Sequence, residues 1–92
     1  MALLANEEIE SRLADSPWTR DGDAITRELK LADFAAAVDF TNRVAAVAEE
    51  LDHHPDILIH GWNKVRLTLS THSAGGLTEA DFALAERLDA LA

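Results

Sequence analysis

The chain has 92 residues, 48% of them hydrophobic, with four glycines and two prolines. This composition is typical of one globular domain with a single core, residues 1–92, and it excludes a disordered chain. Seventeen Asp and Glu outnumber eight Lys and Arg, and the formal net charge of -9 repels a phosphate backbone, so we expect no direct binding of nucleic acid. Cysteine is absent, which excludes disulfides and thiolate metal sites.

The N-terminal segment lacks the features of a targeting signal. Residues 1–8 contain no basic side chain and turn acidic at Glu7, whereas a secretory signal begins with a basic region. No apolar run in the chain approaches the roughly 20 residues that span a bilayer. We therefore predict a cytoplasmic protein with no membrane segment.

The first thirty residues predict a helix followed by a hairpin. Asn6 is a candidate N-cap for a helix that Pro17 ends, because an amide oxygen can accept from free N–H groups and proline cannot continue a helix. Residues 18–20 and 24–31 then have the pattern of two strands around the turn at 21–23. The glycine of that turn tolerates the positive φ that a tight hairpin needs.

The longest predicted helix spans residues 33–51 and has a wide apolar band. Ala, Val and Phe recur at helical spacing on two adjoining stripes. The alanines allow the helix to lie close to a sheet, and the extra width suits a neighbouring subunit or another protein. An entirely intramolecular core explains the same pattern, so the sequence leaves both alternatives open.

Two more strands and a last helix complete the chain. Ile57 and Ile59, and then Leu67 and Leu69, recur with the period of two that is typical of strands. A capping signature at residues 78–81 then starts the last helix. The predicted order is αββαββα, an α+β fold in which a four-stranded antiparallel sheet has three helices packed on one face.

Three of the four histidines are predicted to meet in one place. His53 and His54 lie where the long helix ends. If the following hairpin turns near residues 62–64, antiparallel partners have residue numbers that sum to about 126. That register places His72 opposite His54 and Pro55 and gathers the three imidazoles.

The chemistry expected of this group is acid–base catalysis. Imidazoles beside Glu49 and Asp52 can donate and accept protons near neutral pH, which no other unperturbed side chain does. His60 is excluded from the group, because it lies on a strand beside the turn at Gly61 and is expected to face solvent.

Simpler roles compete with catalysis. A helix C-terminus favours an imidazolium cap, but capping requires neither a second adjacent histidine nor a third across the hairpin. Zinc could take three imidazoles and Glu49. However, adjacent residues of an extended segment point apart, and neither His-x-His nor His-x-x-x-His occurs among these histidines. Asp81 has two compatible roles, as a capping-box carboxylate or as a supporting group that reaches the site past the loop at Gly75 and Gly76.

The same residues resemble the signature of the pterin-4a-carbinolamine dehydratase family. The likeness covers nearly the whole chain, and the residues that carry it most specifically are Glu49, His53, His54, Pro55, Trp62, His72 and Asp81. The resemblance implies a four-stranded antiparallel sheet with three helices. That fold agrees with the element order that the hydrophobic pattern predicts.

The resemblance also implies an activity. Family members dehydrate 4a-hydroxytetrahydropterin, the carbinolamine left by aromatic amino-acid hydroxylases, to quinonoid dihydropterin in the recycling of tetrahydrobiopterin, without a metal or redox cofactor. The family's three active-site histidines fall on His53, His54 and His72. We assign proton transfer to His54 and His72, and orientation of the pterin or work on its other face to His53.

Further residues are expected to bind the pterin or support the histidines. Glu49 and Asp52 would orient the imidazoles or raise their basicity. The complete supporting set is Glu49, Asp52, Pro55, Asp56, Trp62, Ser70, Thr71 and Asp81. Trp62 stands where tyrosine is commoner in the family, and one extra residue between Pro55 and this aromatic predicts a bulge at Gly61.

The resemblance implies binding roles as well. Some members form dimers and tetramers, an animal relative stabilises the dimer of a homeodomain transcription factor, and some bacterial relatives with eroded motifs assist the assembly of another enzyme. We therefore predict a homodimer or homotetramer, with helix 33–51 as the candidate surface for a protein partner. The intact histidine set favours the enzyme over a pure binding module.

Overall fold

The structure is a computed structural model that describes residues 2–92. Its helices and strands follow the predicted order αββαββα, with one additional short 3-10 helix, η1, before the last helix. Their bounds are α1 (Asn6–Leu13), β1 (Thr19–Asp21), β2 (Ala24–Lys30), α2 (Phe34–Leu51), β3 (Asp56–His60), β4 (Lys64–Leu69), η1 (His72–Ala74) and α3 (Glu79–Asp89). The α+β fold with three helices and four strands is therefore confirmed.

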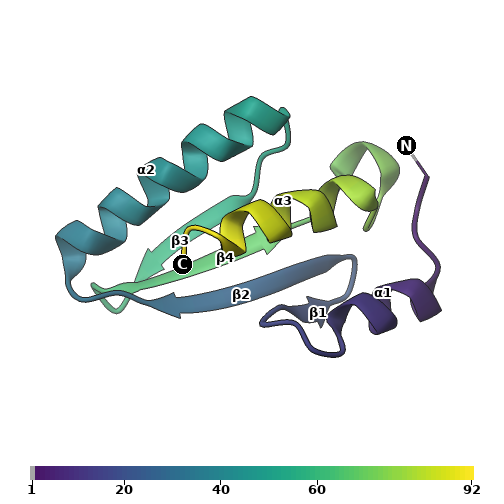
Figure 1. Ribbon diagram of the computed structural model, residues 1–92, viewed down its shortest axis with the longest axis horizontal. Helices are drawn as coiled ribbons and strands as arrows, with labels where there is room; N and C mark the ends of the chain where they lie inside the picture. The colour runs from purple at the N-terminus through teal and green to yellow at the C-terminus, as the bar shows by residue number, and fades with distance from the viewer. Residues whose placement is uncertain (1) are drawn as a thin grey trace.

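The four strands form one antiparallel sheet in the order β1-β2-β4-β3 (Figure 1). β4 lies between β2 and β3, so both of its edges are hydrogen-bonded, and its odd-numbered residues Val65, Leu67 and Leu69 are fully buried. The alternate residues Arg66 and Thr68 face the other side, as the pleat requires. One face of the sheet is thus the core face and the other is open.

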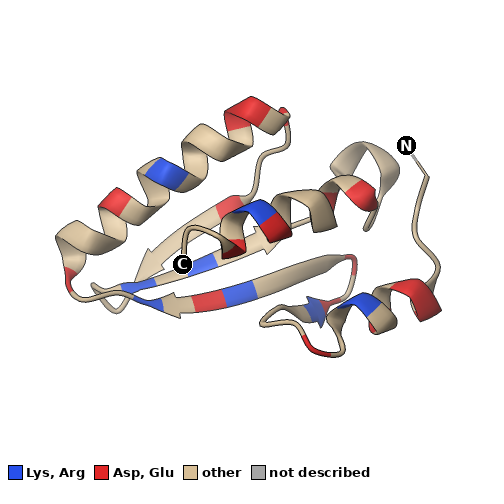
Figure 2. Ribbon diagram, viewed as in Figure 1, with Lys and Arg blue, Asp and Glu red and all other residues tan. Residues whose placement is uncertain are grey.

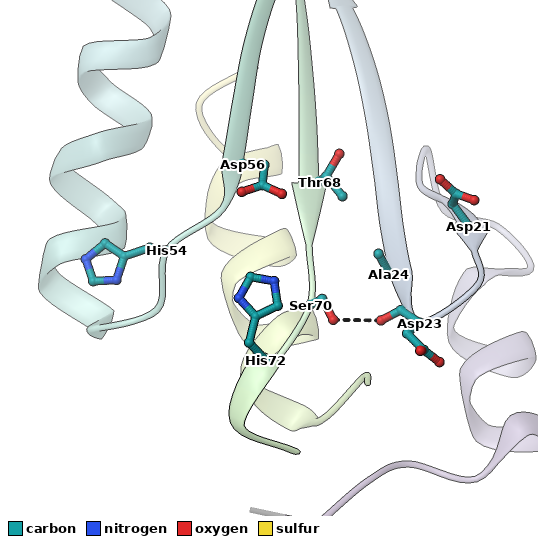
Figure 3. A pocket seen from close by; sticks show the side chains of 8 residues that line it. All are labelled: Asp21, Asp23, Ala24, His54, Asp56, Thr68, Ser70 and His72. Carbon is teal, nitrogen blue, oxygen red and sulfur yellow. Dashed lines mark hydrogen bonds between the residues drawn. The ribbon is translucent and has the colours of Figure 1, made fainter. Parts of the chain in front are cut away.

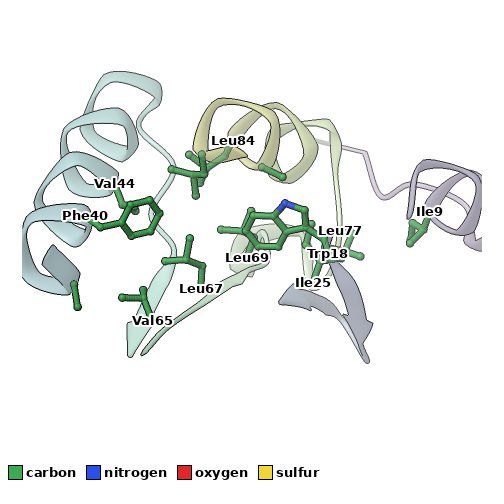
Figure 4. Close-up of a cluster of buried hydrophobic side chains, with 13 residues drawn as sticks. Ile9, Trp18, Ile25, Phe40, Val44, Val65, Leu67, Leu69, Leu77 and Leu84 are labelled. Atoms are coloured by element: carbon green, nitrogen blue, oxygen red, sulfur yellow. The ribbon is translucent and has the colours of Figure 1, made fainter. Parts of the chain in front are cut away.

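The core lies between the sheet and helices α2 and α3 (Figure 4). β2 and β4 contribute branched aliphatic side chains, and α2 and α3 contribute side chains at helical spacing, which explains why the two periods in the sequence are so clear. The buried hydrophobic cluster is Ile9, Trp18, Ile25, Ala37, Phe40, Val44, Val65, Leu67, Leu69, Leu77, Leu84, Ala85 and Leu88.

The predicted cap of the first helix was wrong by one position. Asn6 is the first residue of α1, and Ala5 occupies the N-cap position without a side-chain hydrogen bond. The Asn6 side chain is used elsewhere, because its Oδ1 accepts a hydrogen bond of 3.0 Å from an Arg20 guanidinium nitrogen of β1. The helix ends at Leu13, before Pro17. α1 is therefore attached to the edge strand by a side chain that was expected to satisfy its own backbone.

The register of the second hairpin also differs from the prediction. Asp56 pairs with Thr68 and His60 with Lys64, so partners sum to 124 and not to about 126. The pairing is unbroken between these ends, so the extra residue lies in the loop and not in a bulge at Gly61. Gly61 and Trp62 both have positive φ, 54° and 60°, and this three-residue loop absorbs the insertion.

Helix α2 has well-defined ends. The Asp33 carboxylate accepts a hydrogen bond of 2.8 Å from the Ala36 N–H, which caps the N-terminus. At the other end Asp52 adopts the left-handed conformation with φ of 50°, and the His53 N–H donates to the Ala48 carbonyl at 3.1 Å. This reversal directs the chain from α2 into β3. None of the helices in residues 2–92 is long and apolar enough to cross a membrane.

Candidate active site

A cleft of about 240 Å³ opens at one end of the sheet, where the chain leaves α2 and enters β3 and where β4 ends (Figure 3). Thr68 and Ser70 of its lining have the parity opposite to the buried Leu67 and Leu69, so the cleft lies on the open face. The complete lining is Asp21, Asp23, Ala24, His54, Asp56, Thr68, Ser70 and His72.

Two of the three predicted histidines line this cleft. His72, in the first turn of η1, is exposed, and Figure 3 shows its ring rising beside Asp56 into the middle of the cleft. The His54 ring lies over the end of α2, where its Nε2 is 3.0 Å from Glu49 Oε2. The His54 side chain is 57% exposed, so packing leaves its ring free to rotate.

His53 does not line the cleft. Its side chain, 15% exposed, points to the helix side, where Nε2 is 2.6 Å from Oδ1 of Asp81 at the start of α3. Successive residues of an extended segment point to opposite faces, which explains why the His53 and His54 side chains lie on different sides of the sheet. The prediction that three imidazoles gather in one place is therefore wrong for His53 and correct for His54 and His72.

Asp81 is fully buried and belongs to a hydrogen-bond network at the N-terminus of α3. Its Oδ2 accepts 2.8 Å from the Thr71 hydroxyl and 2.9 Å from the Thr78 N–H, which closes the predicted capping box. The Thr71 and Thr78 hydroxyls are 2.8 Å apart. The predicted capping role of Asp81 is thus confirmed, and its other oxygen contacts His53, which does not line the cleft.

The remaining predicted site residues have mixed positions. Ser70 lines the cleft and donates a hydrogen bond of 2.8 Å to the Asp23 carbonyl, and half-buried Pro55 leads into β3. Asp52 ends helix α2 and forms no hydrogen bond or ion pair with an imidazole within residues 2–92. Trp62 lies in the loop at the other end of β3 and β4, is 62% exposed, and does not line the cleft. Asp52 and Trp62 are thus outside the site that the structure forms.

Two aspartates of the cleft were missed from the sequence. Asp21 and Asp23 were interpreted only as turn residues of the first hairpin. The pairing of Ile25 with Leu69 places that turn at the same end of the sheet as His72. This position of the turn follows only from the pairing of β2 with β4, which are far apart in the sequence. With Asp56 these aspartates give the cleft three carboxylates, which accept hydrogen bonds and repel anionic ligands.

His60 lies away from the cleft, as predicted. Its Nε2 contacts the carboxylate of Glu28, whose other oxygen accepts a hydrogen bond of 3.0 Å from Arg66 Nε. Burial alone would raise the pKa of Glu28, but the hydrogen bonds from Arg66 and His60 outweigh it and hold that pKa below its ordinary value. These three side chains form a surface ion-pair cluster on the open face, outside the cleft lining.

No three His, Asp or Glu side chains among residues 2–92 are arranged so that they could hold a metal ion. His54 and His72 share the cleft, but His53 is hydrogen-bonded to Asp81 on the other side of the sheet. The chemistry available to the cleft residues themselves is proton transfer by two imidazoles and hydrogen bonding by three carboxylates.

Comparison with known proteins covers the whole chain. The family model described as pterin 4 alpha carbinolamine dehydratase matches residues 2–91. A protein of Nocardia farcinica, named "Putative pterin-4-alpha-carbinolamine dehydratase", is 52% identical over 98% of this chain and 95% of its own length. A protein of Roseiflexus castenholzii with the same name is 52% identical over 96% of this chain and 95% of its own length.

Two solved structures share the fold. A transcriptional coactivator/pterin dehydratase from Brucella melitensis superposes with a TM-score of 0.88 and 39% identity, over 97% of both chains. A pterin dehydratase-like protein identified as a RuBisCO assembly factor in the alpha-carboxysome superposes with a TM-score of 0.68 and 30% identity, over 84% of this chain and 90% of the other. Two proteins with the same fold thus carry names that refer to different functions, a transcriptional coactivator/pterin dehydratase in one and an assembly factor in the other.

Proposed function

The chain belongs to the pterin-4a-carbinolamine dehydratase family, and we propose that it dehydrates 4a-hydroxytetrahydrobiopterin to quinonoid dihydropterin and water, in the recycling of tetrahydrobiopterin. The observation that carries the proposal is the cleft in which His54 and His72 lie with three aspartates. Family membership supplies the reaction, and the cleft supplies the groups that the reaction needs.

The reaction is a loss of water that requires two proton transfers. The bond between C4a and the hydroxyl oxygen breaks as a proton is delivered to that oxygen, and a proton is removed from the neighbouring ring nitrogen as the new carbon–nitrogen double bond forms. A group that changes its charge near neutral pH suits each transfer. Two imidazoles at one cleft can therefore serve as the acid and the base of a single turnover.

We assign these transfers to His54 and His72. His72 extends into the middle of the cleft, and His54 reaches it by rotation of its exposed side chain away from Glu49. Asp56 and Asp23 suit the amino and N–H groups of a pterin, because carboxylates accept hydrogen bonds and donate none when ionised. Ser70, held by the Asp23 carbonyl, keeps this side of the cleft in place.

The proposal is tested by the decay of 4a-hydroxytetrahydropterin that a hydroxylase generates in the assay. Native protein should accelerate the decay, also after chelation. His54→Ala and His72→Ala should each lower the rate by about 10²- to 10⁴-fold, toward the uncatalysed reaction, because each removes a proton-transfer group. Loss of the native activity on chelation would instead indicate a metal enzyme.

His60→Ala is the matched control for these variants. It removes an imidazole of the same chain from the open face, where His60 contacts Glu28 and lies outside the cleft. Its dehydration rate should stay within about twofold of the native rate. A native protein without acceleration would reject the enzyme proposal, and an equal loss in all three variants would show that the assay reports stability and not catalysis.

Binding of protein partners is a second candidate function, and a specific feature of the surface favours it. Phe34 and Leu51 at the ends of α2, and Leu58 on the free edge strand β3, are exposed by 56%, 36% and 48%. Exposed apolar side chains on an unpaired edge suit contact with another chain. We propose that these surfaces serve self-association, and that α2 is the surface for any further protein partner.

A further inference from the structure

The two histidines of the cleft each follow a residue of the buried network at α3. His53 precedes His54, and Thr71 precedes His72. His53 and Thr71 both hydrogen-bond Asp81, through different oxygens of one carboxylate. Because successive residues in extended backbone face opposite sides, the network holds the backbone on the helix side while the next side chain is presented to the cleft.

The hydrogen bonds of this network have a definite direction. The Thr78 N–H can only donate, and it donates to Asp81 Oδ2 together with the Thr71 hydroxyl. Asp81 therefore acts as an acceptor on that oxygen, as a carboxylate does. Its other oxygen lies 2.6 Å from His53 Nε2, and because an ionised carboxylate can only accept, we infer that His53 Nε2 is the donor.

The network also joins three separate segments of the chain. His53 belongs to the connection between α2 and β3, Thr71 to the connection between β4 and η1, and Asp81 to the first turn of α3. Asp81 is completely buried and the His53 side chain is 15% exposed, and a buried carboxylate with all of its hydrogen bonds formed is rigid and specific. The backbone of Thr71 is additionally paired with Gly76, which closes the η1 loop.

We propose that Thr71 is a positioning residue, which sets the relative placement of His54 and His72 through the Asp81 carboxylate and the Nε2-protonated tautomer of His53. This inference rests on the proposed function for its kinetic effect, but its structural part stands on the hydrogen bonds alone. The two cleft imidazoles are aligned by one carboxylate that touches neither of them.

The test compares Thr71→Val with Thr71→Ser. Valine keeps the shape of threonine but removes the hydroxyl that donates to Asp81, whereas serine keeps that hydroxyl. With the native hydroxylase-coupled assay as reference, Thr71→Val should lower kcat by about tenfold with KM changed by less than about twofold, because misplaced groups slow the reaction more than they weaken binding. Thr71→Ser should restore kcat to within about twofold of native.

Nitrogen-15 NMR of the imidazoles supplies a readout that does not depend on activity. In native protein His53 should carry its proton on Nε2, with a signal protected from solvent exchange, at every pH where it is neutral. Thr71→Val should weaken that protection and shift the ring signals of His54 and His72, while the His60 signals stay unchanged as an internal control. Thr71→Ser should return all of these signals toward their native positions.

The outcomes separate this inference from the proposed function. A native His53 protonated on Nδ1, or a Thr71→Val protein with native kcat and native His54 and His72 signals, would overturn the positioning role. A native protein that shows the expected signals but no dehydration would reject the proposed function and leave the structural device intact. If Thr71→Val does not fold, two measurements still test the positioning role of Thr71. A native His53 protonated on Nδ1, or a folded Thr71→Ser protein whose kcat falls well outside twofold of native, would overturn it.

Discussion

Asp52 ends helix α2 with φ of 50°, and its backbone N–H donates to the Ala48 and Glu49 carbonyls of the last turn. This left-handed conformation is the usual end of a helix, and it favours glycine over residues with a Cβ. At the scale of the residue, the role of Asp52 is therefore to end helix α2 by its backbone conformation. Its carboxylate forms no hydrogen bond with His53 or His54, whose ring nitrogens contact Asp81 and Glu49.

The conformation of Asp52 predicts an order of stability for two variants. Asp52→Gly should be more stable than Asp52→Ala by about 1 kcal/mol, because alanine carries the steric cost of a left-handed residue without the polar side chain that eases it. Urea unfolding of both variants measures the difference. Dehydration rates should be equal in the two variants, and a specific loss of kcat in both would instead return Asp52 to the site.

At the scale of elements, one glutamate joins three strands on the open face of the sheet. Glu28 of β2 accepts from Arg66 of β4 and contacts His60 of β3. Figure 2 shows an acidic band between basic ones on β2, basic bands on β4, and both signs of charge on the three helices. The lowered pKa of Glu28 means that the folded state favours its ionised form. Its contribution to stability is present above the ordinary value of 4.5 and is lost as pH falls through the lowered folded value.

Glu28→Gln tests this linkage. The variant should be less stable than native protein at pH 6, by less than about 1 kcal/mol because the cluster is exposed, and the difference should shrink as pH falls below about 4.5. Denaturant unfolding at several pH values measures it. Glu10→Gln is the control, since Glu10 is an exposed residue of α1 with no ion pair among residues 2–92. A difference that grows toward low pH would contradict the expected sign of the linkage.

At the scale of the whole molecule, the proposed self-association predicts a particle larger than one chain. Light scattering during size exclusion should give a mass of two or four chains of 10.0 kDa, because exposed apolar side chains and a free strand edge are covered by a second copy. Phe34→Ser tests the α2 surface and Leu58→Ser the β3 edge. The variant that lowers the mass identifies the contact, and a native mass of 10.0 kDa would reject the proposal.

Local patterns were sufficient wherever a residue acts through its own segment. The alternation of Val65, Leu67 and Leu69 predicts a strand with one buried face, and the spacing of Thr78 and Asp81 predicts a capping box. His54 and His72 were found as candidates because they flank one predicted hairpin. For the strand and the capping box the deciding interactions are near in sequence, so period and capping chemistry describe them.

Tertiary structure decided what depends on segments distant in the chain. The pairing of β2 with β4 brings Asp21 and Asp23 to the cleft, and the packing of α3 against the sheet brings Asp81 to His53. A three-residue loop with two positive φ angles changed the hairpin register. The sequence by itself determined the helices and strands, their buried faces and the choice of His54 and His72 as candidate site residues. Only the fold determined which side of the sheet each histidine faces, because facing is set by register and by partners that lie far away in sequence.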